Sequence, residues 1–127
     1  MSVQISTGVD MIEIDRIEAA LSRWGDRFLR RVYTEGELAH CRGRPERLAG
    51  RFAAKEAVSK ALGVGIRTLR WRDIEVLPDH RGKPHVYLHG KAATVAHARG
   101  LTNLDISISH SRSDAVVIVV AWGQQPE

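Results

Sequence analysis

Apolar and polar residues alternate at the start of the chain, and a helical spacing follows directly. In residues 3–9 the apolar side chains fall mainly at odd positions, and this period of two predicts a strand that ends at Asp10. In residues 14–21 the apolar positions recur at helical spacing. They predict a helix that Gly25 interrupts.

Two further helices are predicted from the signals at their ends. Thr34 and Glu37 fit a capping box for a short helix that runs through residue 38. Pro45 suits the first position of a longer helix over residues 45–62, and Gly63 suits its end.

The second half of the chain is mostly strands. Apolar positions in residues 74–76 and 86–88, with turn-forming residues 79–83 between them, predict two strands joined by a turn. Residues 91–99 predict a helix that Gly100 ends.

Two last strands complete the pattern. Residues 104–109 alternate, so one face of that strand is polar, whereas residues 115–122 are apolar throughout. Such a continuous run is typical of a strand that is buried on both faces. We therefore predict an α+β fold, in which helices cover an antiparallel sheet, built as one domain over residues 1–127.

Composition narrows the class of protein. The 127 residues are 43% hydrophobic, which suits one compact domain. No apolar run reaches the ~18–20 residues of a membrane helix. The first residues lack the features of a signal peptide, and Cys41 is the one cysteine. We expect a cytoplasmic protein without an intrachain disulfide or a membrane segment.

The charge points to an anionic partner. The formal net charge is +4, and arginine supplies 15 of the 19 basic residues. The partner could be a nucleic acid, an acidic protein or a phosphorylated ligand. The aromatic residues form no base-stacking array, and the spacings of helix-turn-helix and zinc-finger proteins are absent. We therefore expect no nucleic acid.

The helix over residues 45–62 carries two charged residues away from its core face. At 100° per residue, Glu56 and Lys60 lie on roughly the opposite side from that face. They could form an exposed pair at i, i+4 that stabilises the helix by ~0.3–0.5 kcal/mol. Alternatively, Glu56 is a metal ligand or base and Lys60 binds phosphate. The apolar positions that define the core face are Ala54, Ala57, Val58, Ala61 and Leu62.

Asp10 is the second acidic residue of interest, because aspartate is depleted in strands. At a strand end it could cap the next helix. It could also meet Glu56 in space, and two carboxylates are the least that a protein contributes to a Mg²⁺ site. Glu13 and Asp15 lie in the same stretch, and spacing alone does not choose among the three.

Other segments could bind a phosphorylated ligand. Ser109, His110 and Ser111 end a strand with a polar face, where they could contact phosphate oxygens or simply be solvated. Gly63 and Gly65 form only a fragment of a phosphate loop. A Gly-x-Ser-x-Gly hydrolase motif is absent.

Several arginines share one predicted helical surface. Arg16, Arg23, Arg27 and Arg30 recur at i, i+7, i+11 and i+14, and Asp26 is the one nearby acidic residue that offsets them. A charged face is usually just solvated. This one also suits docking of an acidic partner.

Two motifs in this order resemble the holo-acyl-carrier-protein synthase family, the small single-module type of 4′-phosphopantetheinyl transferase. The first motif is Gly8-x-Asp10 with Arg16 six residues later. The second is Arg51-Phe52-Ala53-Ala54-Lys55-Glu56-Ala57, followed by Lys60, Ala61 and Gly63. The resemblance extends to Thr34 and Glu37, to Gly82-Lys83-Pro84 and to the strand end at residues 107–111.

The resemblance implies an activity and a set of partners. Members transfer 4′-phosphopantetheine from coenzyme A to a serine of apo-acyl carrier protein, releasing adenosine 3′,5′-bisphosphate, in support of fatty acid biosynthesis. Asp10 and Glu56 would hold Mg²⁺, and Lys60 would neutralise charge on the transferring group. The base would be Glu56 or a metal-bound water.

The resemblance also implies binding surfaces and an assembly. The family forms a cyclic trimer, so Asp10 and Glu56 would come from one subunit and His110 from its neighbour. Residues expected to bind coenzyme A are Lys60, Gly63, Gly65, Lys83, Pro84, Ser109, His110 and Ser111. Residues expected to dock the carrier are Arg16, Arg23, Arg27 and Arg31. Two other classes stay open: a different metal-dependent phosphohydrolase, and a non-catalytic binder of acidic proteins.

Overall fold

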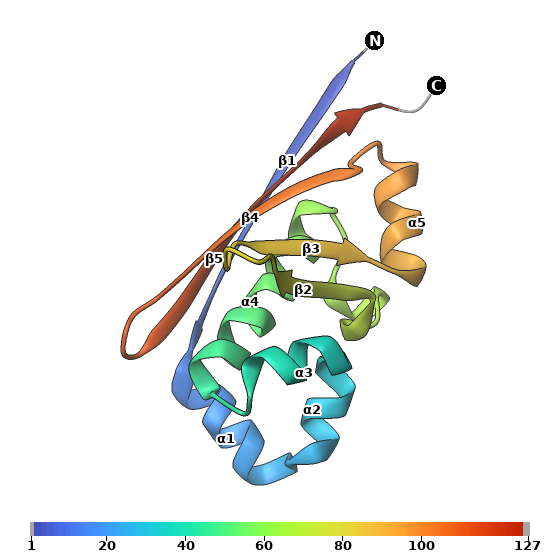
Figure 1. Ribbon diagram of the computed structural model, residues 1–127. Helices are drawn as coiled ribbons and strands as arrows, with labels where there is room; N and C mark the ends of the chain where they lie inside the picture. Colours follow the sequence, from blue (N-terminus) through green and yellow to red (C-terminus); the bar gives the residue numbers. More distant parts are fainter. Residues whose placement is uncertain (1, 126–127) are drawn as a thin grey trace.

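The structure is a computed structural model, and it describes residues 2–125. After β1 the chain forms four helices in a row, then two short 3₁₀ turns, η1 and η2, and then β2, β3, α5, β4 and β5 (Figure 1). The helices are α1 (Ile14–Trp24), α2 (Asp26–Val32), α3 (Glu35–Cys41), α4 (Pro45–Ala61) and α5 (Gly90–Ala98). The turns are η1 (Ile66–Thr68) and η2 (Trp71–Asp73). The strands are β1 (Val3–Glu13), β2 (Ile74–Pro78), β3 (Pro84–Leu88), β4 (Asn103–His110) and β5 (Asp114–Gln124).

The strands form two antiparallel sheets. β1, β5 and β4 make a long sheet with β5 in the centre, and β2 pairs with β3 in a second, shorter one. The prediction that the first strand ends at Asp10 is wrong. β1 continues to Glu13 because its pairing with β5 continues through Glu13 and Asp114, and Asp10 therefore lies within the strand, opposite Val117.

Most helix boundaries predicted from local signals are confirmed. Thr34 and Glu37 form both hydrogen bonds of a capping box at the start of α3, although this helix continues to Cys41. Pro45 begins α4. Gly25, with φ of +54°, separates α1 from α2. Of the described helices, none is both long and apolar enough to cross a bilayer.

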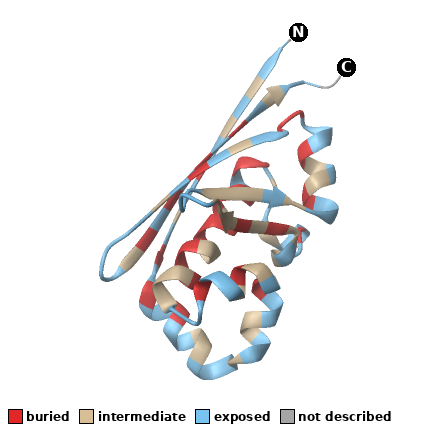
Figure 2. Ribbon diagram, viewed as in Figure 1, coloured by how far each residue is buried: buried red, intermediate tan, exposed pale blue. Residues whose placement is uncertain are grey.

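α4 packs across the inner face of the long sheet, where buried residues concentrate (Figure 2). Gly8 on β1 makes this close approach possible. A Cβ atom built on Gly8 would lie 1.9 Å from the carbonyl oxygen of Ala57. A side chain there would therefore separate the strand from the helix, and the glycine sets how near Asp10 comes to α4.

A buried ion pair fixes the other side of α4. Lys55 Nζ donates to Glu37 Oε1 at 2.7 Å, and both side chains are fully buried. Lys55 also donates to the carbonyl oxygens of Trp71 and Ile74, and the second oxygen of Glu37 accepts from the Val76 amide. Burial lowers the pKa of Lys55, and Glu37 opposes that shift. The pair holds α3, α4, η2 and β2 together, and loss of either charge would leave the other buried without a partner.

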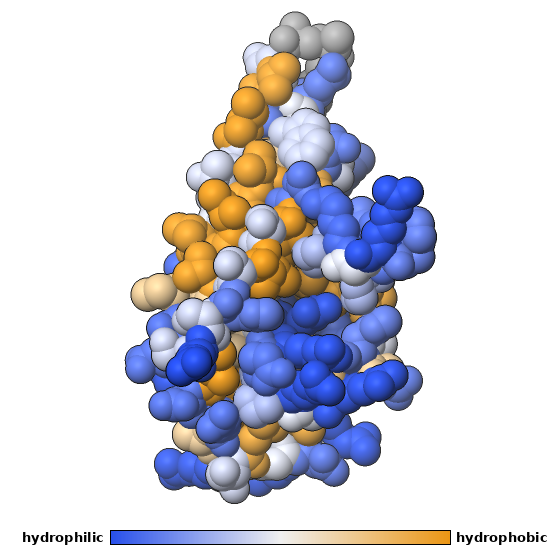
Figure 3. Space-filling view, turned by 60° about the vertical axis from the view of Figure 1, so that its left-hand side comes forward, coloured by the Kyte–Doolittle hydropathy of each residue, from blue (hydrophilic) through white to orange (hydrophobic). Residues whose placement is uncertain are grey.

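The burial of β5 differs from the prediction made for residues 115–122. Its apolar residues alternate between buried and exposed positions, so the predicted burial on both faces is wrong for this chain. The exposed side chains, together with those of β1, form an apolar outer face along the sheet (Figure 3). Its large residues are Val3, Ile5, Val9, Met11, Val116, Ile118, Val120 and Trp122.

Candidate active site

Asp10 and Glu56 line the same cavity, which has a volume of about 240 Å³. Asp10 comes from the inner face of β1 and Glu56 from α4, and the contact of these two elements at Gly8 brings the carboxylates to one place. Arg16 of α1 lines the cavity as well, and Phe28 and Phe52 form part of its apolar wall.

Glu56 is in an environment that disfavours its charge. Burial raises the pKa of its carboxyl, and the neighbouring Asp10 carboxylate raises it further, while Lys60 and Arg16 act in the opposite direction. Two carboxylates in one partly apolar cavity repel each other. A cation between them would relieve this repulsion.

Lys60 bonds to Asp10 and not to its helix neighbour. Its ammonium donates to Asp10 Oδ1 at 3.0 Å and to the Val9 carbonyl at 3.1 Å. The Lys60 side chain is 55% exposed and that of Asp10 13%. No ion pair joins Lys60 to Glu56 among residues 2–125. The simple i, i+4 pair considered from the sequence is therefore not what the structure contains.

The capping role considered for Asp10 is also wrong. The residue that precedes α1 is Glu13, and its side chain makes no capping hydrogen bond. Glu13 and Asp15 are both exposed and are not among the residues that line the cavity with Asp10. Of the three acidic residues in this stretch, the structure brings Asp10 to Glu56.

The donor set suits a hard divalent cation. Within the described chain, no group of three or more His, Cys, Asp or Glu side chains is placed to hold a metal. Asp10 and Glu56 would therefore be the protein's carboxylate contribution, and other oxygen ligands would complete the shell. Mg²⁺ is bound in this way, through one or two carboxylates, waters and substrate phosphates.

Gly63 and Gly65 follow the end of α4, close in sequence to Lys60. Gly63 has φ of +75°, a conformation that glycine adopts without strain. Its amide donates to the Lys60 carbonyl and ends the helix. Gly65 has an ordinary extended backbone with open space around it.

Lys83 and Pro84 lie where the second sheet begins its return strand, away from the cavity. Lys83 Nζ donates to Asp105 Oδ1 of β4 at 2.9 Å and helps to lower the pKa of that carboxyl. Pro84 opens β3 opposite Pro78. Neither residue is among those that line the cavity of Asp10 and Glu56.

The Ser109–Ser111 segment forms the end of β4 and the start of its hairpin with β5. His110 is exposed and lies opposite Ala115. The Ser111 hydroxyl accepts from the amides of Ser113 and Asp114, which shapes the turn. In the sheet, β5 separates this strand from β1, so a single chain does not bring these residues into the cavity that Asp10 lines.

The arginines considered for docking run along α1 and α2. Arg16 lines the carboxylate cavity, and the Arg23 guanidinium lies 4.9 Å from the centre of the Trp24 ring. Arg27 and Arg31 line a neighbouring cavity of about 330 Å³. All four are exposed.

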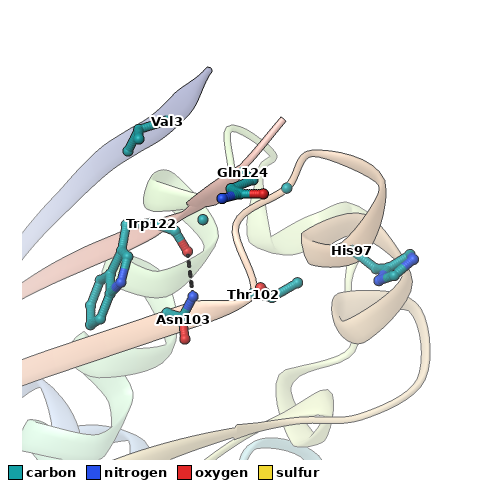
Figure 4. Close-up of a pocket in the computed structure, with 8 residues that line it drawn as sticks. Val3, His97, Thr102, Asn103, Trp122 and Gln124 are labelled. Atoms are coloured by element: carbon teal, nitrogen blue, oxygen red, sulfur yellow. Dashed lines mark hydrogen bonds between the residues drawn. The ribbon is translucent and has the colours of Figure 1, made fainter. Parts of the chain in front are cut away.

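Another hollow, of about 760 Å³, lies at the end of the long sheet where the described chain starts and finishes (Figure 4). Asn103 donates there to the Trp122 carbonyl at 3.2 Å. Among its described lining residues, only His97 has an ionisable side chain. This hollow therefore offers fewer groups for catalysis or metal binding than the cavity of Asp10 and Glu56.

Comparison with known proteins indicates the family of this chain. A family model described as the 4′-phosphopantetheinyl transferase superfamily matches residues 6–117. The holo-acyl-carrier-protein synthase of Herpetosiphon aurantiacus is 50% identical over 124 residues, covering 92% of this chain and 98% of that protein.

Similar solved structures are also acyl-carrier-protein synthases. The Helicobacter pylori holo-acyl-carrier-protein synthase in complex with coenzyme A is similar at 34% identity and a TM-score of 0.83, covering 91% of this chain and 98% of its own. The Plasmodium yoelii acyl carrier protein synthase with ADP bound has 32% identity and a TM-score of 0.88, covering 98% and 100%.

The chain belongs to the 4′-phosphopantetheinyl transferase superfamily. Its relatives within the superfamily are holo-acyl-carrier-protein synthases, so the resemblance noted in the sequence, the α+β fold and the assignment to this class of enzyme are confirmed.

Two features of this superfamily member were missed by reasoning from the sequence. The first is the packing role of Gly8, although a glycine two residues before Asp10 in a strand was a usable signal. The second is an aromatic cluster around Phe52. The Phe52 ring stacks on that of Trp71 with their centres 4.6 Å apart, and its centre lies 6.2 Å from that of the Phe28 ring. These residues are far apart in sequence, and no local pattern links them.

Proposed function

We propose that this chain transfers the 4′-phosphopantetheine group of coenzyme A to a serine of apo-acyl carrier protein, with Mg²⁺, in support of fatty acid biosynthesis. The observation that carries the proposal is the meeting of Asp10 and Glu56 in one cavity, with the Lys60 ammonium bonded to Asp10 at 3.0 Å. Membership of the superfamily supports the reaction class, and coenzyme A complexes of related proteins support the donor.

Each residue has a defined role in the proposed reaction. Asp10 and Glu56 would hold the Mg²⁺ ion, which would supply positive charge to offset that of the pyrophosphate. Lys60 reaches from the solvent side and neutralises charge on the group in transfer. Phosphoryl transfer depends mainly on such positioning and charge stabilisation. Glu56, or a water that it orients, accepts the proton of the carrier serine.

The remaining sites come from a second copy of the chain in this proposal. The assembly is a cyclic homotrimer that buries the apolar outer face of the long sheet, since exposed apolar surface of this extent marks an interaction site. The coenzyme A residues Lys83, Pro84, Ser109, His110 and Ser111 then reach the carboxylate cavity of a neighbour. None of these residues lines the cavity within one chain, and this supports the arrangement.

The carrier docks on the arginine surface of α1 and α2, formed by Arg16, Arg23, Arg27 and Arg31. Acyl carrier protein is acidic and this surface is basic, so the charges are complementary. The expectation of a cytoplasmic protein that binds neither nucleic acid nor membrane stays a prediction.

One assay tests the proposed function. Incubation with coenzyme A, apo-acyl carrier protein and Mg²⁺, followed by mass spectrometry, should show a carrier heavier by one phosphopantetheine. Cleavage of coenzyme A without a gain in carrier mass would instead indicate a phosphohydrolase. An unchanged carrier and unchanged coenzyme A would leave only a binding function. Either of these outcomes would overturn the proposal.

A further inference from the structure

A groove of about 920 Å³ lies between the end of α2 and the segment that carries η1 and η2. It is separate from the cavity of Asp10 and Glu56, and none of the sites discussed above includes the η1–η2 side. Five of its lining residues are arginines: Arg30, Arg31, Arg67, Arg70 and Arg72. We call this the arginine groove.

The charge of the arginine groove is largely uncompensated. No ion pair among residues 2–125 involves any of its five arginines. Asp73 is the one acidic residue in the described lining. Its carboxylate lies at the start of α5, where both oxygens are 3.0 Å from the position of a Cβ built on Gly90. Five guanidinium groups therefore face one carboxylate, an arrangement that favours an anionic ligand.

The η1–η2 wall of the arginine groove is held in place from inside. The Trp71 carbonyl accepts a hydrogen bond from the buried Lys55 ammonium at 3.0 Å, and the Trp71 ring stacks on Phe52. The Thr68 hydroxyl donates to the Gly65 carbonyl at 2.7 Å and closes η1. The arginines are thus presented on a preorganised turn, and little ordering of the backbone is needed when an anion binds.

One intervening cavity lies between the arginine groove and the candidate active site. Arg31 lines both the groove and the neighbouring cavity that contains Arg27 and Phe28. Phe28 in turn lines the cavity of Asp10 and Glu56. The intervening cavity therefore shares one lining residue with each of the other two, so the three hollows follow one another from the carboxylates to η2.

We propose that the arginine groove extends the docking surface for the acidic acyl carrier protein from α1 and α2 to Arg67, Arg70 and Arg72 on the η1–η2 side. The inference rests on the proposed function. A carrier whose serine reaches Asp10 and Glu56 covers the adjoining hollows, so its acidic residues come to the groove. The cationic groups are spread over α2, η1 and η2, which suits several carboxylates on a protein surface better than one phosphate group.

Charge reversal at Arg67 and Arg70 tests the proposal, because both residues are exposed and neither side chain makes a hydrogen bond or an ion pair within the described structure, whereas the one backbone bond of Arg70, from the Asp73 amide to its carbonyl, does not depend on its side chain. The double variant Arg67→Glu/Arg70→Glu should bind apo-acyl carrier protein about tenfold more weakly in a titration without coenzyme A. Its KM for the carrier should rise to match, with KM for coenzyme A and kcat unchanged. The difference from wild type should shrink as salt is raised.

Arg44→Glu is the matched control, since Arg44 is an exposed arginine outside the described linings of these hollows. Circular dichroism and thermal unfolding confirm that each variant folds. Carrier binding by the double variant no weaker than by Arg44→Glu would overturn the inference. So would a raised KM for coenzyme A with normal carrier binding, which would assign the groove to the donor. A wild-type chain that binds the carrier but does not modify it would contradict the proposed function and leave the groove standing.

Discussion

The two faces of the long sheet are built from different kinds of residue. The inner face is small and closely packed: Gly8, Ala115, Val117, Val119 and Ala121 are buried beneath α4. The outer face is large and open, with eight apolar side chains that are 36–70% exposed. Because buried and exposed residues alternate along these strands, the two faces of the sheet are suited to different contacts.

The inner face sets the distance between β1 and α4, and in the proposed assembly the outer face contacts other copies of the chain. Small residues allow the backbones of β1 and α4 to touch, which sets the distance between Asp10 and Glu56. Large apolar residues contribute free energy in proportion to the area removed from water, with no fine directional demand. Changes on the inner face should therefore damage the fold and the chemistry, and changes on the outer face should damage assembly first.

Gly8→Ala should have the largest effect. A methyl group 1.9 Å from the Ala57 carbonyl oxygen forces α4 away from β1, so we expect the free energy of unfolding to fall by about 3 kcal/mol or more. Urea unfolding measures this. Gly65→Ala is the control, because it has open space and an ordinary backbone. Equal stability of the two variants would show that Gly8 does not set the contact.

Asp10→Asn and Glu56→Gln should each lower the transfer rate by about 10²–10⁴ while the protein stays folded. Both substitutions preserve shape and remove a charge that would hold Mg²⁺. Steady-state kinetics at saturating Mg²⁺ provide the measurement. Glu13→Gln and Asp15→Asn, which change exposed carboxylates outside the described lining of the cavity, should keep the wild-type rate. A wild-type rate in either cavity variant would contradict the assignment.

Ile118→Lys should break the outer face and leave the inner face intact. A charge in the middle of this apolar surface costs far more when the surface is buried than when it is in water, so the variant should become a folded monomer. The transfer rate should fall to below about one tenth of wild type, because the proposed site is shared. Sedimentation analysis checks the mass. Tyr87→Lys, which changes an exposed apolar residue outside this face, should keep the wild-type assembly.

Mixing Asp10→Ala with His110→Ala should restore part of the activity that each variant lacks alone. With random exchange, three quarters of the trimers are mixed, and one of three junctions in each joins an intact Asp10 to an intact His110. About one quarter of wild-type activity should return. No recovery after subunit exchange has been verified by mass would show that the site lies within one chain.

The arginine surfaces extend the comparison to the helical side of the molecule. α1 and α2 present their arginines on a helical repeat that is visible in the sequence. The arginine groove combines α2 with η1 and η2, and no repeat predicts it. A surface built from separate segments is known only once the chain has folded.

Many helix and strand positions in this protein could be predicted from the sequence alone, wherever a few neighbouring residues specify them. A capping box needs only Thr34 and Glu37, a helix start needs only Pro45, and the break at Gly25 needs only one residue. The order of strands and helices followed from periodicity, because each repeat reflects the geometry of its own segment. The two motifs that contain Asp10 and Glu56 resemble those of the family, and the comparisons confirmed the family.

The tertiary structure alone decided which contacts those elements make. A period of two shows that the faces of β1 and β5 differ, but not which face meets α4 and which stays exposed on the chain. The sequence gives no indication that Lys60 bonds to Asp10, fifty residues away, in preference to its neighbour Glu56. The buried pair of Lys55 and Glu37 is equally hidden, because two ordinary helix positions become a core only when the helices pack. Such choices depend on close approach between distant segments, and in this chain that approach depends on the absence of a side chain at Gly8.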